Sequence, residues 1–202
     1  MAAEPRVTFS RIGGHVALDL LNTVEWRLDS EQTIDDLTSY GQVLEWAQQA
    51  ELINRQEQTA LRRLETKRTR QAEAELAVFQ HLRETAYAAL VEHQAGAVEE
   101  VVAQHLEALT RAALLPVGDR WAWTEPALAL SIPRDRAVRA VIDLLTSPGL
   151  AALHQCEDAA CGWVYLDTSP QRNRRWCVAA DCGNRNRARR FYARQKAKSA
   201  QP

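Results

Sequence analysis

The stretch CEDAACGWVYLDTSPQRNRRWCVAADCGN, residues 156–184, contains every cysteine of the chain. Cys156 and Cys161 enclose four residues, Cys177 and Cys182 enclose four more, and fifteen residues separate the two pairs. The first residues lack the apolar core of a secretory signal, which predicts a cytoplasmic location where thiols stay reduced. A disulfide framework is therefore the weaker interpretation, and four thiolates in two short loops favour a tetrahedral zinc site.

The predicted site is closed and structural, with one zinc ion per chain, because four cysteines complete the tetrahedral shell. A catalytic zinc normally uses three protein ligands and keeps one position for water. His154 could replace a ligand, but a surface position suits it better while four cysteines are present. Glu157 and Asp158 are expected in a solvated turn. Buried cysteines without metal and redox-active cysteines remain as alternatives.

The residues around the cysteines predict a β-hairpin followed by a helix. Residues 162–166 are aromatic and β-branched, residues 167–170 have turn chemistry, and residues 174–177 would form the returning strand. Gly183 and Asn184 suit a tight turn and a helix cap, and the residues from 185 to 198 favour helix. This order is that of a small treble-clef-like module, for which metal supplies much of the folding free energy.

Charge is divided unequally along the chain of 202 residues. Residues 171–202 carry ten Lys and Arg and one acid, whereas residues 1–170 carry 15 bases and 25 acids. Nucleic-acid phosphates are a natural counterpart of such a basic segment, because each contact releases condensed counterions. The predicted nucleic-acid-binding residues are Arg174, Arg175, Arg185, Arg187, Arg189, Arg190 and Arg194.

On a helical wheel, Ala188, Phe191, Tyr192 and Gln195 share one face, which we expect to pack against the hairpin. A helix that enters a major groove favours DNA, whereas exposed aromatic side chains would favour RNA. Two other interpretations stay open. The basic segment could dock on the acidic body or on an acidic partner protein, with zinc purely structural, or it could be a solvated face without a specific role.

Residues 1–148 predict a mainly α-helical domain, and residues 149–202 the zinc module. A helix is expected to start at Thr33, and another at Asn54 with a capping box. The sequence contains no apolar run long enough for a membrane span.

A short hairpin is expected within residues 117–132. Its alternation would place Trp121 and Trp123 on one face, as part of the core or of an interface. The domain shows no phosphate-binding loop, dinucleotide fingerprint or hydrolase motif, so we expect a protein that is not an enzyme.

Two polar residues lie among apolar neighbours near the start of the chain. Asp19 and Asn22 are three positions apart and therefore share one side of a helix. They could bind a small effector, with Arg27, Trp26 or His15 completing the pocket, or they could be the centre of a small-molecule enzyme. The alternative, which we favour, is that they satisfy buried backbone groups and brace the entrance turn.

The string Cys182-Gly183-Asn184-Arg185, after Arg-Arg-Trp-Cys at 174–177, resembles the bacterial CGNR zinc-finger family. Gly13 to Thr23, GGHVALDLLNT, and the later segment 44–46 are similar to the ABATE domain that commonly precedes this module. The resemblance implies a stress-induced transcription regulator. By the same resemblance the four cysteines would bind zinc. Our leading hypothesis is that the module binds DNA and that the first domain senses an effector or forms a homodimer.

Overall fold

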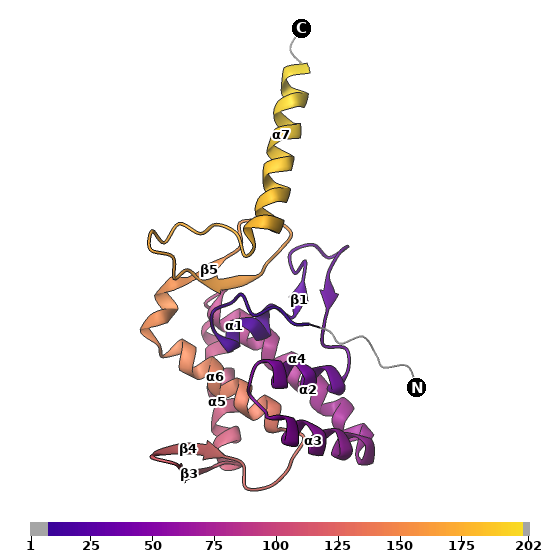
Figure 1. Ribbon diagram of the computed structural model, residues 1–202, viewed down its shortest axis with the longest axis vertical. Coiled ribbons are helices and arrows are strands. Elements are labelled where there is room, and N and C mark those ends of the chain that lie inside the picture. Colours follow the sequence, from indigo (N-terminus) through magenta and orange to yellow (C-terminus); the bar gives the residue numbers. More distant parts are fainter. Residues whose placement is uncertain (1–7, 200–202) are drawn as a thin grey trace.

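The computed structural model describes residues 8–199 (Figure 1). The helices are α1 (Val16–Leu21), α2 (Tyr40–Gln49), α3 (Arg55–Lys67), α4 (Thr69–Leu90), α5 (Ala95–Thr110), α6 (Ile132–Leu145) and α7 (Asn184–Ser199), with single turns η1 (Pro148–Ala152) and η2 (Ala179–Gly183). The strands form three antiparallel pairs, β1 (Val24–Glu25) with β2 (Ile34–Asp35), β3 (Ala113–Val117) with β4 (Arg120–Thr124), and β5 (Leu153–Gln155) with β6 (Val164–Leu166). The predicted mainly α fold is confirmed.

The core lies between the helices of the first domain. Helix α4 packs against α5, α5 packs against α6, and the short α1 lies against both α4 and α6 (Figure 1). Apolar residues at helical spacing explain this arrangement, because they give each helix one buried stripe. Phe79 of α4 meets Trp46 of α2 edge to face, with ring centroids 5.6 Å apart. Burial of each large apolar side chain stabilises the fold by roughly 1.5–3 kcal/mol.

One predicted helix start is confirmed and one is wrong. Helix α3 begins after Asn54, whose side chain accepts hydrogen bonds from the backbone of Glu57 in a capping box. The start expected at Thr33 is instead the approach to strand β2, and α2 begins after Ser39, which has its own capping box. Residues 34–35 pair with β1, and Asp36 N donates to Thr23 O, so tertiary pairing overrides the local helix signal.

The β3–β4 hairpin lies at the opposite end of the long axis from α7 (Figure 1). It begins at Ala113, earlier than expected. Trp121 is 66% exposed and Trp123 is 46% exposed, so they are not part of the core, and the alternative of an interface stays a prediction. Within residues 8–199, no helix is both long and apolar enough to cross a membrane.

The hairpin next to the cysteines differs from the predicted one. Strand β6 pairs with residues 153–155, which come before the first cysteine, and residues 174–177 form no strand. The carboxylate of Asp167 accepts from the backbone of Ser169 and of Arg174, which folds the chain back across the end of β6. The returning segment is therefore held by side chains and by a backbone hydrogen bond from Glu157 N to Arg175 O, without a strand ladder.

Candidate metal centre

The four cysteines converge on one point from two loops. Cys156 and Cys161 lie in the connection between β5 and β6, whereas Cys177 precedes η2 and Cys182 lies within it. All four are buried, and their sulfur atoms lie within 4.8 Å of one another. The Sγ atoms of Cys161 and Cys177 are 3.6 Å apart, and those of Cys177 and Cys182 are 3.3 Å apart.

These distances fit a single tetrahedral ion. Zinc–sulfur bonds of about 2.3 Å place neighbouring sulfur atoms about 3.8 Å apart at the corners of a tetrahedron. Without a cation, the thiols compete for ionisation: hydrogen bonds from Cys161 lower the pKa of Cys156, whereas the pKa values of Cys161 and Cys177 are raised by their bonds to Cys156. Four thiolates this close need a cation between them, so the donor set fits zinc.

Two glycines let the backbone approach closely on either side of the sulfur cluster. Gly162, after Cys161, has a φ of +73°, and a Cβ there would lie 2.8 Å from the Cβ of Arg27. Gly183, after Cys182, lies against the ring of Trp176, 3.1 Å from the place where its Cβ would be. Both positions therefore favour glycine, the first because left-handed backbone is costly for other residues.

Asp158 is fully buried inside the first cysteine loop, so its predicted place in a solvated turn is wrong. Its carboxylate pairs with Arg189 at 2.8 Å and with Arg185 at 3.3 Å. Burial alone would raise the pKa of Asp158, but the hydrogen bonds from Arg189 and from the backbone of Ala160 lower it below the usual value. An ionised carboxylate inside the module thus ties the first loop to α7.

Arg185 makes the largest set of contacts at the base of α7. Its guanidinium donates to the Sγ of Cys182 at 2.8 Å, pairs with Asp158 and Asp181, and lies 4.4 Å from the ring centroid of Trp26. Trp26 belongs to the first domain and has a φ of +52°. Arg185 therefore joins the cysteine cluster, α7 and the first domain at one place.

Two further predicted nucleic-acid-binding arginines are anchored inside the module. The guanidinium of Arg174 lies 3.9 Å from the ring centroid of Tyr165 and donates to the carbonyl of Trp176. Arg175 forms an ion pair with Glu157, with Nε 2.8 Å from a carboxylate oxygen. These contacts orient both side chains, so their part in nucleic-acid binding stays a prediction.

Helix α7 projects away from the rest of the molecule (Figure 1). Arg187, Arg190 and Arg194 are exposed on it. The aromatic face that we expected to pack on the hairpin is also outside: Phe191 is 53% exposed and Tyr192 is 70% exposed, so that prediction is wrong. The helix starts too close to the cysteines and points too steeply outward for its middle to reach the hairpin.

The four residues of the possible effector pocket have other partners in the structure. Asp19 accepts from the backbone of Gly13 at 2.9 Å, and His15 caps α1 through its Nδ1. The side-chain amide of Asn22 donates to Val164 O at 2.9 Å and accepts from Val164 N at 2.8 Å. Asp19 and Asn22 thus brace buried backbone groups, and Asn22 ties α1 to β6.

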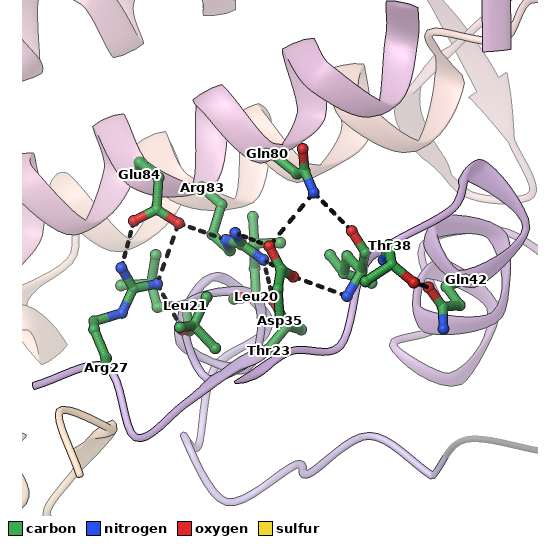
Figure 2. A network of polar contacts seen from close by, with 12 residues as sticks. Leu20, Leu21, Thr23, Arg27, Asp35, Thr38, Gln42, Gln80, Arg83 and Glu84 are labelled. Atoms are coloured by element: carbon green, nitrogen blue, oxygen red, sulfur yellow. Dashed lines mark hydrogen bonds and ion pairs between the residues drawn. The ribbon is translucent and has the colours of Figure 1, made fainter. Parts of the chain in front are cut away.

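Arg27 takes part in a different network, which Figure 2 shows. It pairs with Glu84 of α4, and its guanidinium lies 4.2 Å from the ring centroid of Tyr87. Glu84 also accepts from the buried Arg83, which makes two hydrogen bonds of 2.7 Å to Asp35. The network joins β2 and α4 to the loop that touches the cysteines.

Sequence reasoning missed that loop as part of the site. Arg27 N donates to Cys161 O at 3.0 Å, Leu28 N donates to Ala160 O, and the indole of Trp163 donates to Val24 O at 2.9 Å. No local pattern links Trp26 or its neighbours to the cysteines, because those partners lie more than a hundred residues away. The burial of Asp158 was also missed. Its position between Cys156 and Cys161 was the one sequence signal that it belongs to the metal centre.

The fold and the cysteine cluster define a class of protein, a helical domain followed by a four-cysteine zinc finger. The family of CGNR zinc fingers matches residues 153–195, and the ABATE family, described as "Putative stress-induced transcription regulator", matches residues 14–148. The chain belongs to the ABATE family. Among curated proteins, none matches this chain.

Proposed function

We propose that this protein is a transcription regulator that binds DNA through α7, with one structural zinc ion per chain fixing the base of that helix. The observation that carries the proposal is that the arginines of α7 differ in their contacts. Arg185 and Arg189 pair with the buried carboxylate of Asp158, whereas Arg187, Arg190 and Arg194 lie on the exposed surface of the helix, where Arg187 also bonds to Asn184. Spacings of three and four residues place those three along one side of the helix.

An α-helix fits the major groove of DNA, where arginine forms bidentate contacts to guanine or phosphate. Zinc, when bound by the four cysteines, offsets part of the negative charge of the thiolates and supplies folding free energy to a module with a small apolar core. The residues of the module then orient α7: Asp158 holds Arg189, and Arg185 bridges to Trp26. The proposal includes no catalytic step.

The test is a binding assay on zinc-loaded full-length protein with a library of genomic DNA fragments, read at increasing salt. Arg190→Gln should weaken binding and reduce the slope of log affinity against log salt by about 1, because one phosphate contact is lost. Arg120→Gln, on the exposed tip of the β3–β4 hairpin, is the matched control and should leave the slope unchanged. Equal slopes for the wild type and both variants would contradict the proposal.

The exposed aromatic pair on α7 favours a second candidate, binding of RNA or single-stranded nucleic acid. Phe191 and Tyr192 lie edge to face with ring centroids 5.7 Å apart. Stacking of a base on an aromatic side chain contributes about 1–3 kcal/mol. Tyr192→Ala should then weaken binding to single-stranded RNA about tenfold or more while duplex DNA binding changes little. Weaker binding of Tyr192→Ala to duplex DNA, with binding to single-stranded RNA unchanged, would support duplex DNA as the ligand.

For effector sensing, we propose the hollow between α2 and α3 as a site for a small anion. It has a volume of about 620 Å³ and polar walls that include Arg55, Gln58, and the ion pair of Glu45 with Arg62. The guanidinium of Arg55 suits a carboxylate or phosphate, whereas that of Arg62 is paired with Glu45. A panel of small carboxylates and phosphates should contain a compound that raises the melting temperature of wild-type protein but not of Arg55→Gln. A panel without any such compound would count against this site.

A further inference from the structure

The β3–β4 hairpin carries the densest group of exposed apolar side chains in the described part of the chain. These side chains are Leu114, Leu115, Val117, Trp121 and Trp123. An isolated two-stranded hairpin is only marginally stable in water, and tryptophan is costly to leave exposed in pairs. The feature therefore needs a covering surface.

The register of the hairpin places both tryptophans on one face, whereas Leu115 and Val117 lie on the other. Leu114 is opposite Trp123, and Pro116 is opposite Trp121. Residues directly opposite in an antiparallel pair point to the same side of the sheet, so these four form one uncharged face. Ala122 and Thr124 lie on the other side and are half-buried. The tryptophan face, as we name Leu114, Pro116, Trp121 and Trp123, thus points away from the helical domain.

We propose that the tryptophan face is the contact between two copies of this chain in a symmetric dimer. Leu114, Trp121 and Trp123 are 47%, 66% and 46% exposed, which corresponds to roughly 400 Å² per copy, so a symmetric pair would bury roughly 800 Å², the size of a weak, reversible contact. A two-fold contact brings the same patch of both copies together, which an uncharged patch permits without like-charge repulsion. The contact does not depend on the nucleic-acid binding proposed above.

The structure also favours a face-to-face contact over lengthening of the sheet. Pro116 removes a backbone donor from β3, and proline on an edge strand discourages pairing with another strand. The hairpin and α7 lie at opposite ends of the long axis, so a dimer formed here leaves α7 uncovered (Figure 1). One small module recognises DNA with limited specificity, and two α7 helices in one assembly would increase it.

The experiment measures the mass of zinc-loaded full-length protein by sedimentation equilibrium over a wide concentration range. The wild type should be a reversible dimer. Trp121→Arg should raise the dimer dissociation constant about 30-fold or more, as expected for a tryptophan at the centre of an interface. Val78→Arg, at an exposed apolar position on α4, is the matched control and should leave the constant unchanged.

A second variant keeps the test valid if Trp121→Arg fails to fold. Trp123→Phe preserves an apolar ring and should keep most of the association, whereas Trp123→Arg should lose it, both with unchanged far-UV circular dichroism. A wild type that is monomeric at every concentration would overturn the proposal. A dimer that resists both arginine variants would overturn it as well, because the contact would then lie elsewhere.

Discussion

The helical domain and the zinc module are stabilised by different means. The core of the helical domain consists of leucine, valine and aromatic side chains from several helices. In the module, the buried cluster consists of the four cysteines and Tyr165. Apolar burial can hold the first region together by area alone, whereas the module depends on metal, ion pairs and backbone contacts. The difference predicts two regions that respond to different perturbations.

The two regions are nevertheless joined at several points. Asn22 bonds both backbone groups of Val164, and Leu166 N donates to Gly13 O at 2.8 Å. Trp26 lies under Arg185 at the base of α7. The first domain therefore supplies part of the surroundings of the metal centre, and a change in its loop could alter the orientation of α7.

Removal of metal should have the largest effect and should be confined to one region. Chelation or Cys177→Ser is expected to unfold the module and α7, because zinc supplies about 10–16 kcal/mol to small modules of this kind. The helical domain should keep its structure. Hydrogen exchange resolved by residue measures both outcomes, with Ala180→Ser on the exposed part of the second cysteine loop as control. If α7 stayed protected from hydrogen exchange after removal of metal, the module would not depend on zinc for its folding.

A cavity in the helical core should have the converse effect. Phe79→Ala is expected to lower the free energy of unfolding of the helical domain by about 3–5 kcal/mol, because Phe79 is buried against Trp46. Zinc affinity should not change. Urea unfolding and competition with a chromogenic chelator measure the two quantities. The neighbouring exposed Val78→Ala should change stability by less than about 0.5 kcal/mol.

Arg185 tests the joint between the regions. Arg185→Gln removes the hydrogen bond to the Sγ of Cys182 and should weaken zinc binding about 10- to 100-fold, the usual effect of losing a partner of a metal ligand. It should also change the fluorescence of Trp26, which lies beneath the guanidinium. Arg190→Gln, farther along α7, should leave zinc affinity unchanged. Equal zinc affinities for both variants and the wild type would show that Arg185 does not support the metal centre.

The smallest effect concerns pH. Burial raises the pKa of Asp19 to about 6, although the backbone of Gly13 and the charge of Arg11 act in the opposite direction. A raised carboxyl pKa means that the folded state binds the proton more tightly. Its contribution to stability is therefore present at low pH and lost as pH rises through about 6.

Acidification from pH 7 to pH 5 should thus increase the stability contributed by Asp19 by about 1 kcal/mol. Asp19→Asn should abolish this increment while keeping the acceptor for Gly13. Urea unfolding at several pH values measures the difference between the wild type and the variant, and the exposed Asp119→Asn serves as control. The same pH dependence in the wild type and in Asp19→Asn would place the titrating group elsewhere.

Sequence alone was sufficient for the features that depend on neighbouring residues. The spacing of the cysteines predicted one cluster, and their sulfur atoms do converge. Asn54 and Glu57 predicted a capping box, and Asp19 and Asn22 were correctly favoured as braces for buried backbone. Each of these patterns is contained in a short segment or in the chemistry of one residue type.

Tertiary structure decided the features whose partners are distant in the chain. The strand beside β6 is residues 153–155, whereas the segment 174–177 is held by the carboxylate of Asp167 and by a backbone bond from Glu157 N to Arg175 O. Asp158 is buried because Arg185 and Arg189 reach it from α7, and Phe191 is exposed because that helix projects outward. Local spacing determines what a residue is able to do, but burial and charge pairing depend on which distant segment folds against it.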